Sequence, residues 1–198
     1  RYTEGDGTDK DPAQAARWFA LASEDGDLRA TDLLGRSYEN GSGVEKDEAR
    51  AAECYLQAAE QDYAPAQTNL AVCYFNGIGV DKDVECAHQW LEKAAEQGQA
   101  RAQSLLGSCY RDGDGVEADA AQAAEWYGKA AKQNYPPAMC SLGLAFELGE
   151  GLTEDPAKAV YWYTKAAEQG HTTAQLNLGW CHLNGKGTPV NREEALKW

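Results

Sequence analysis

AMCSLGLAFELGEGLTEDPAKAVYWYTKAAEQG, residues 138–170, is the stretch that decides the fold, because close variants of it recur along the whole 198-residue chain. Its Gly149, Gly151 and Asp155 have counterparts 36 residues earlier, at Gly113, Gly115 and Asp119. The same spacing, without any insertion, runs through a series of tryptophans and one cysteine: Trp18, Cys54, Trp90, Trp126, Trp162 and Trp198. A fixed period of about 20–50 residues is typical of proteins built from stacked repeats.

The repeat predicts one continuous array, because each unit needs its neighbours to bury its apolar face. We therefore expect residues 1–198 to form a single solenoid domain. Its expected units are a partial unit at 2–29, full units at 30–65, 66–101, 102–137 and 138–173, and a partial unit at 174–198. Because Arg1 begins inside one unit and Trp198 ends inside another, we expect both ends to be cut from a longer protein.

The sequence of each unit predicts two helices joined by a loop. The first, helix A, is expected over residues such as 66–76, where Leu70 and Tyr74 have the i, i+4 spacing of one helical stripe. It should end at a glycine such as Gly149, a residue suited to a left-handed C-terminal position. The second, helix B, is expected over residues such as 119–133, with the aspartate as its N-cap and the tryptophan series in its core.

A glycine in the middle of helix A, such as Gly143, costs helix propensity and is best explained by another helix that passes close to it. Helix pairs of this kind stack into superhelices. The predicted fold is therefore all-α: a right-handed α-solenoid of helix-loop-helix repeats with a period of 36, in which helix A faces the inside of the curve.

Composition limits the partners. A net charge of −14 disfavours nucleic acid and anionic membrane surfaces, which both reward Lys and Arg. A basic peptide or protein patch would suit this charge, although acidic faces can also serve only to keep the molecule in solution. No run of about 18 apolar residues is present, so we expect no membrane insertion.

The recurring pattern A-x-x-x-L-G-x-x-Y-x-x-G-x-G-V-x-x-D-x-x-x-A-x-x-W-y-x-x-A-A-x-x-G resembles the Sel1-like repeat family, which is related to tetratricopeptide repeats. This resemblance covers essentially all of residues 2–198. It implies a curved scaffold that holds other proteins, in bacterial signalling, envelope assembly and host interaction or in eukaryotic protein-quality-control complexes. It implies no shared reaction, since a fold does not dictate a function.

By analogy with tetratricopeptide arrays, positions 3, 7 and 10 of helix A, counted from the recurrent alanine, would line the concave face. The last unit is wholly apolar at these positions, and large apolar residues on a surface indicate a contact site. Alternatively, these residues pack against a further helix. The residues that we expect to bind a partner peptide or helix are Phe75, Arg111, Leu144, Leu176, Trp180 and Leu183.

The recurring Asn69 and Asn177 lie one position away from this column and are expected to bond to the backbone between helices, a contact with a peptide amide being the other reading. None of the column residues is Lys or Asn, the residues with which tetratricopeptide clamps hold a C-terminal carboxylate.

The six cysteines predict neither disulfides nor a metal site. Cys73, Cys109 and Cys181 share one repeat position, which suits a small side chain in a helix contact, and Cys54 stands in the tryptophan series. Cysteine-rich relatives staple each helix pair with closely spaced cysteines, and that spacing is absent. Reduced thiols favour a cytoplasmic location. Zinc would require paired Cys and His at short spacing.

The sequence predicts a non-enzyme without a cofactor. Some cysteine-rich relatives have been described as penicillin-binding or β-lactamase-like, but the S-x-x-K motif of that chemistry is missing. H-E-x-x-H, G-x-S-x-G, a phosphate loop and a dinucleotide fingerprint are missing as well. We therefore expect a non-catalytic interaction scaffold. A purely structural spacer within a larger protein is the alternative, and a hydrolase is a minor one.

Overall fold

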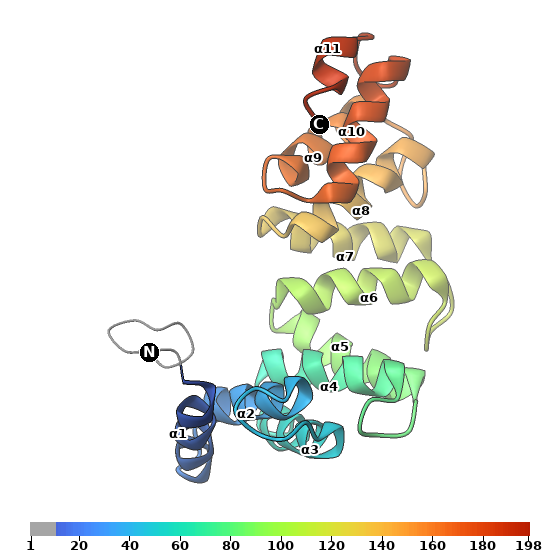
Figure 1. Cartoon of the computed structure of the whole chain (residues 1–198). Coiled ribbons are helices and arrows are strands. Elements are labelled where there is room, and N and C mark those ends of the chain that lie inside the picture. The colour runs from blue at the N-terminus through green and yellow to red at the C-terminus, as the bar shows by residue number, and fades with distance from the viewer. Residues whose placement is uncertain (1–10) are drawn as a thin grey trace. The chain divides into compact units, whose positions relative to one another are not determined.

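The computed structural model describes residues 11–198, and these fold as helices connected by short loops (Figure 1). Residues 2–10 of the expected first partial unit lie outside the described residues. The chain divides into two compact units, residues 1–97 and 98–198, which we describe one at a time. Unit 1 contains α1 (Pro12–Glu24), α2 (Leu28–Asn40), α3 (Glu48–Ala59), α4 (Ala64–Asn76) and α5 (Val84–Glu96). Unit 2 contains α6 (Ala100–Asp112), α7 (Ala120–Lys132), α8 (Pro136–Leu148), α9 (Pro156–Ala167), α10 (Thr172–Asn184) and α11 (Arg192–Ala195).

The even-numbered helices are the expected A helices and the odd-numbered ones are the expected B helices. Within each unit every helix packs against the next one along the chain, as in a stack of helical hairpins. The prediction of an all-α fold made of helix-loop-helix repeats is therefore confirmed.

The helix ends follow the predicted chemistry. Each of the A helices α2, α4, α6, α8 and α10 ends at a glycine in the left-handed conformation, with φ of +72° at Gly149. Each B helix begins at an aspartate or asparagine whose side chain accepts a backbone N–H, as Asp155 Oδ1 does from Lys158 at 3.0 Å. These bonds satisfy N–H groups that the first turn of a helix leaves without a partner.

The second glycine of each loop allows two backbones to meet. A Cβ atom placed on Gly151 would lie 2.0 Å from the carbonyl oxygen of Ala120, the first residue of α7. Gly79 has the same relation to Glu48 in unit 1, where the distance would be 1.9 Å. The loop of one repeat thus lies directly on the first turn of the preceding B helix, and no side chain fits between them.

The glycine inside helix A makes room for a tyrosine ring of helix B, as expected from its cost in helix propensity. A Cβ on Gly143 would lie 2.7 Å from Cε1 of Tyr163, and Gly107 stands in the same relation to Tyr127. In the second full repeat the glycine is replaced by Ala71, and there the tyrosine is replaced by the smaller Leu91, with both side chains buried. The size of one residue therefore compensates for the size of the other.

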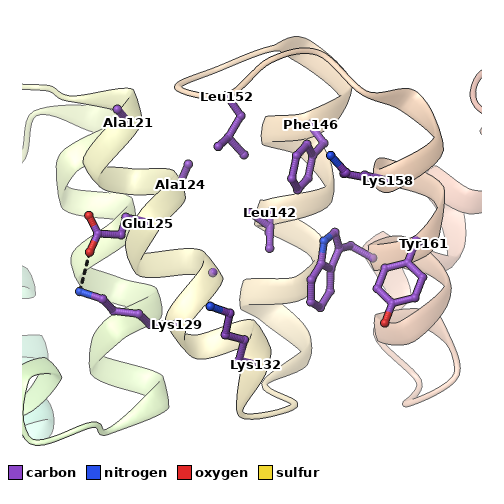
Figure 2. A pocket seen from close by; sticks show the side chains of 12 residues that line it. Ala121, Ala124, Glu125, Lys129, Lys132, Leu142, Phe146, Leu152, Lys158 and Tyr161 are labelled. Carbon is purple, nitrogen blue, oxygen red and sulfur yellow. Dashed lines mark ion pairs between the residues drawn. The ribbon is translucent and has the colours of Figure 1, made fainter.

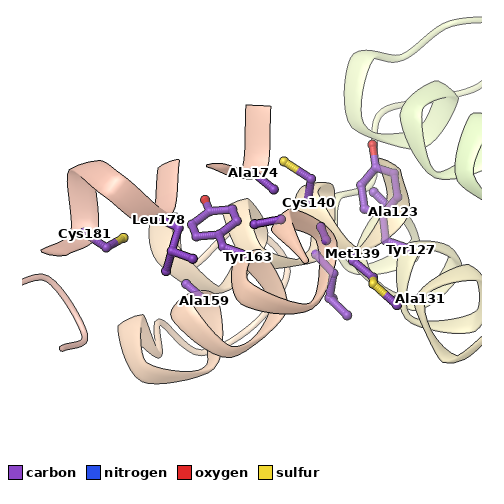
Figure 3. Close-up of a cluster of buried hydrophobic side chains, with 13 residues drawn as sticks. Ala123, Tyr127, Ala131, Met139, Cys140, Ala159, Tyr163, Ala174, Leu178 and Cys181 are labelled. Carbon is purple, nitrogen blue, oxygen red and sulfur yellow. The ribbon is translucent and has the colours of Figure 1, made fainter. Parts of the chain in front are cut away.

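The buried core lies one position further along helix B than the sequence analysis expected. Tyr163 is fully buried among Ala159, Ala174 and Leu178 in the core of unit 2 (Figure 3). Tyr55 has the same place in the core of unit 1. The tryptophans of the repeat are not buried fully: Trp90, Trp162 and Trp198 pack against the core but stay partly exposed, and Trp18 is 56% exposed. The prediction that the tryptophan series lies in the core is therefore only partly right. On a helix, adjacent residues point about 100° apart, so only one of the two can face the partner helix fully.

Candidate functional site

The surface that the sequence analysis singled out is the solvent side of the A helices, here called the A-helix face and defined by repeat positions 7 and 10. Both positions are at least partly exposed in every repeat with a described A helix. Position 3 does not belong to this face in the full repeats, because its residues are buried there: Asp32, Thr68, Ser104 and Cys140. The expectation that position 3 lines the surface is wrong for these units.

In the first full repeat, position 3 instead faces the next repeat. Asp32 Oδ1 accepts a hydrogen bond of 2.7 Å from Nδ2 of Asn69 in the following A helix. This bond joins two side chains, whereas the sequence analysis expected Asn69 to bond to the backbone. Leu176 holds the same position in α10 and is 67% exposed, since no further A helix follows α10 in these residues.

Trp180 and Leu183 are the most exposed large apolar residues of the A-helix face in unit 2, 48% and 52% exposed on consecutive turns of α10. Trp180 contacts a lysine that is itself paired with a glutamate. The Lys186 ammonium lies 5.9 Å from the centre of the Trp180 ring and forms an ion pair of 3.2 Å with Glu147 Oε1. The other oxygen of Glu147 accepts a hydrogen bond of 2.7 Å from the hydroxyl of the buried Tyr163.

The contact with Glu147 keeps the hydroxyl of Tyr163 protonated. Burial and the neighbouring Glu147 carboxylate both raise the pKa of Tyr163 above its ordinary value, so its hydroxyl stays a hydrogen-bond donor. A chain of contacts therefore leads from the core at Tyr163 to the surface at Trp180. A pre-positioned aromatic side chain loses little freedom on binding, which favours its use as an anchor.

Arg111 and Leu144 are brought together, but around a crevice of only about 10 Å³ between α6, α7 and α8. This space holds no more than about one water molecule. Arg111 already donates two hydrogen bonds, of 2.8 and 2.7 Å, to the carboxylate of Asp112, and this contact lowers the Asp112 pKa. Phe75, the remaining candidate, lies partly buried on α4 in unit 1.

The cysteines are packing residues. All six are free, and Cys73, Cys109 and Cys181 are buried at one repeat position, which confirms the predicted role of a small side chain in a helix contact. Burial raises the pKa of each of these three thiols from 9.0 to about 11. The thiolate, the reactive form of cysteine, is therefore suppressed at neutral pH.

Two features that residues 11–198 lack bear on other functions. No cluster of three or more His, Cys, Asp or Glu side chains suited to a metal ion occurs in this part of the chain. Among the helices described, none is both long and apolar enough to cross a membrane.

A larger feature of unit 2 escaped the sequence analysis. A groove of about 740 Å³ lies between the B helices α7 and α9, with α8 between them (Figure 2). It contains none of the six predicted contact residues. The signal that could have revealed it is Gly128, a glycine inside helix B at a position where the other full repeats carry Leu56, Glu92 and Thr164.

Stacked helical hairpins with exposed, partly apolar A-helix positions define the class of α-helical repeat proteins that present surfaces to other molecules. Six matches to the Sel1 repeat model, at residues 1–27, 29–63, 64–99, 100–135, 136–171 and 172–198, place the chain in the Sel1 repeat family. Proteins of this family generally act as protein-interaction scaffolds and are typically non-catalytic.

Solved structures agree with this assignment. A protective antigen of uropathogenic Escherichia coli with an SLR fold is 38% identical, with a TM-score of 0.88 over 98% of this chain, which spans 42% of the length of that protein. A Sel1 repeat protein from Oxalobacter formigenes is 33% identical, with a TM-score of 0.83 over 96% of this chain and 81% of its own. An immunity protein from Pseudomonas aeruginosa is 25% identical, with a TM-score of 0.63 over 100% of this chain and 73% of its own. No curated protein sequence matches the chain significantly.

Proposed function

We propose that this chain is a non-catalytic scaffold that holds an amphipathic segment of a partner protein on its A-helix face, with Trp180 and Leu183 as the apolar anchors. The observation that carries the proposal is the exposure of these two side chains on one stripe of α10, together with the contact between the Trp180 ring and the Lys186 ammonium. Tryptophan is among the residues that most often dominate the energy of protein interfaces.

The chemistry of the partner segment follows from the surroundings. Apolar side chains would cover Trp180 and Leu183, while basic side chains would suit a scaffold with a net charge of −14. Arg111, Leu144 and Leu176 belong to the proposed contact surface of unit 2 as secondary members, and Phe75 is a separate candidate contact residue in unit 1. They are weaker candidates, because Arg111 is occupied by Asp112 and Leu176 lies on the side of α10 that would face a further repeat.

The test is a comparison of three variants by affinity purification and mass spectrometry from cells that make the protein. Trp180→Ala and Leu183→Ala remove the anchors. Leu148→Ala is the matched control, because Leu148 is also 52% exposed but lies off positions 7 and 10. We expect the anchor variants to weaken capture of a bound protein by about 10- to 30-fold and the control to leave it unchanged.

The alternative functions predict other results. A structural spacer within a larger protein would lose thermal stability in the Trp180→Ala variant while its set of bound proteins stays the same. A hydrolase of the penicillin-binding or β-lactamase type would turn over a chromogenic β-lactam. The proposed scaffold does neither.

A further inference from the structure

The groove on the B-helix side of unit 2 has an apolar floor and a basic rim. Leu142 and Phe146 of α8, Leu152 of the following loop and Trp162 of α9 supply apolar surface. Figure 2 shows Phe146 and Leu142 on the middle helix, with Lys129 and Lys132 on one side and Lys158 and Tyr161 on the other. Its volume of about 740 Å³ falls in the range of pockets that bind ligands.

The groove is open at Gly128, where α7 carries no side chain. A Cβ atom on Gly128 would meet no atom within 4 Å, so the middle of α7 is open to solvent at this point. The corresponding residue in unit 1 is Leu56, which packs against the buried cluster that includes Tyr55 and Leu70. In unit 1 a leucine side chain therefore packs against the core from the repeat position that carries no side chain in α7.

The groove in unit 2 and the equivalent surface of unit 1 also differ in charge. The groove lysines Lys129, Lys132 and Lys158 correspond to Gln57, Glu60 and Cys86 in unit 1. Basic residues are scarce in a chain with 18 Lys and Arg against 32 Asp and Glu, yet three of them line this groove beside a single acid, Glu125. The groove thus combines an apolar floor with a lining that carries three lysines and one acid.

Two of the three lysines already have partners, which sets their positions. Lys129 forms an ion pair of 2.8 Å with Glu125 and lies 3.7 Å from the centre of the Trp126 ring. Lys158 forms an ion pair of 3.1 Å with Asp155 and lies 5.3 Å from the centre of the Phe146 ring. Lys132 forms no ion pair with any residue in the described range 11–198, so its charge is available to an incoming group.

We infer that this groove is a second binding surface, and that its occupant is an acidic protein segment in which Asp or Glu flanks Leu, Phe or Trp. The apolar side chains of such a segment would cover Phe146, Leu152 and Trp162. Its carboxylates would meet Lys132 and the neighbouring lysines, and its backbone would pass over Gly128. This inference is independent of the proposed A-helix face, which lies on other helix positions and suits a basic partner.

The test measures binding of fluorescent peptide pools by anisotropy. One pool contains eight-residue peptides in which Asp or Glu alternates with Leu, Phe or Trp, and a second pool has Lys or Arg in place of the acids. We expect the acidic pool to bind at least 10-fold more tightly than the basic pool, and to bind less tightly as salt is added.

Two pairs of variants locate the binding. Gly128→Leu restores the side chain found in unit 1 and should weaken binding of the acidic pool at least 10-fold, while Thr164→Leu adds the same side chain at the same repeat position outside the groove and should not. Lys132→Glu should weaken binding about 10-fold, while Lys82→Glu makes the same charge change in unit 1. Leucine favours helix more than glycine does, so loss of binding in Gly128→Leu would not come from unfolding.

Several outcomes would overturn the inference. They are failure of the acidic pool to bind, equal binding of both pools, undiminished binding to Gly128→Leu, and preferential binding of a single-stranded dT oligonucleotide, which could stack on the same aromatic rings. Binding of the acidic pool should persist in the Trp180→Ala variant. A failure of the A-helix face and a failure of the groove can therefore be distinguished.

Discussion

Replacement of Gly143 by Ala tests how the two helices of a repeat are held together. The new Cβ would lie 2.7 and 2.8 Å from Cε1 and Cδ1 of Tyr163. The ring cannot easily withdraw, because it is fully buried and its hydroxyl is bonded to Glu147. Overpacking of this kind costs about 1–3 kcal/mol, whereas the exchange of glycine for alanine in a helix contributes about 1 kcal/mol of stability. The difference leaves a net loss of up to about 2 kcal/mol.

Gly128→Ala is the matched control, because it makes the same change in a neighbouring helix where a Cβ meets nothing within 4 Å. There only the helix propensity changes, and we expect a gain of about 0.5–1 kcal/mol. The two substitutions should thus have opposite signs. Urea unfolding followed by circular dichroism measures both, and hydrogen exchange of the α8 and α9 amides shows whether the loss is local.

A double-mutant cycle completes the test. Tyr163→Leu removes ring volume and the bond to Glu147, and should cost about 2–4 kcal/mol alone. Combined with Gly143→Ala it recreates the Ala71–Leu91 pair of the second full repeat. The double variant should therefore be more stable than the sum of the single effects predicts, by about 1–2 kcal/mol. Additive effects, or a stabilising Gly143→Ala, would refute the reasoning.

Three further predictions concern the loops, the caps and the thiols. Gly151→Ala should prevent α7 from packing against the α8–α9 loop, because the new Cβ would lie 2.0 Å from the carbonyl oxygen of Ala120, and it should lower the melting temperature strongly. The control is Gly170→Ala, where φ is +82° but the space around the glycine is open, and we expect it to cost only about 1–2 kcal/mol. Asp155→Ala should cost about 1 kcal/mol in urea unfolding through loss of the cap, and Glu154→Ala next to it close to nothing. Stability should fall as pH rises from about 9 to 11, because the Cys73, Cys109 and Cys181 thiols have pKa values of about 11 in the fold and release their protons at lower pH in the unfolded chain. A triple variant with alanine at these three positions should lose less stability over the same pH range. An equal loss of stability in the triple variant would contradict this account.

The sequence alone predicts the architecture well because the repeated residues are those with local physical requirements. The glycines at helix ends need a left-handed backbone, and the aspartates cap helices through their own side chains. Both requirements involve neighbours in sequence, so the period of 36 and the helix boundaries can be read without a structure. The glycine inside helix A also predicts a close helix, although not which ring fills the space.

The burial of side chains was harder to predict, because it depends on the angle at which two helices meet. Trp162 and Tyr163 are adjacent aromatic residues, and the sequence gives no reason to prefer the second as the core residue. The burial of Asp32 likewise depends on Asn69 in the next repeat, 37 residues away. Such contacts follow from the stacking of repeats and not from any one repeat.

The groove was missed for a related reason. The repeat pattern draws attention to residues that recur, whereas the groove results from a residue that does not. Gly128 interrupts no motif, and its effect appears only when the helices on either side are placed around it.

The central functional claim is that the A-helix face of α10 contacts another protein. Photo-crosslinking tests it most directly, with p-benzoylphenylalanine placed at position 180 or, as the control, at position 148 in cells that make the protein. We predict one discrete crosslinked protein from position 180 and none from position 148. The same products from both positions, or no product from position 180, would contradict the claim.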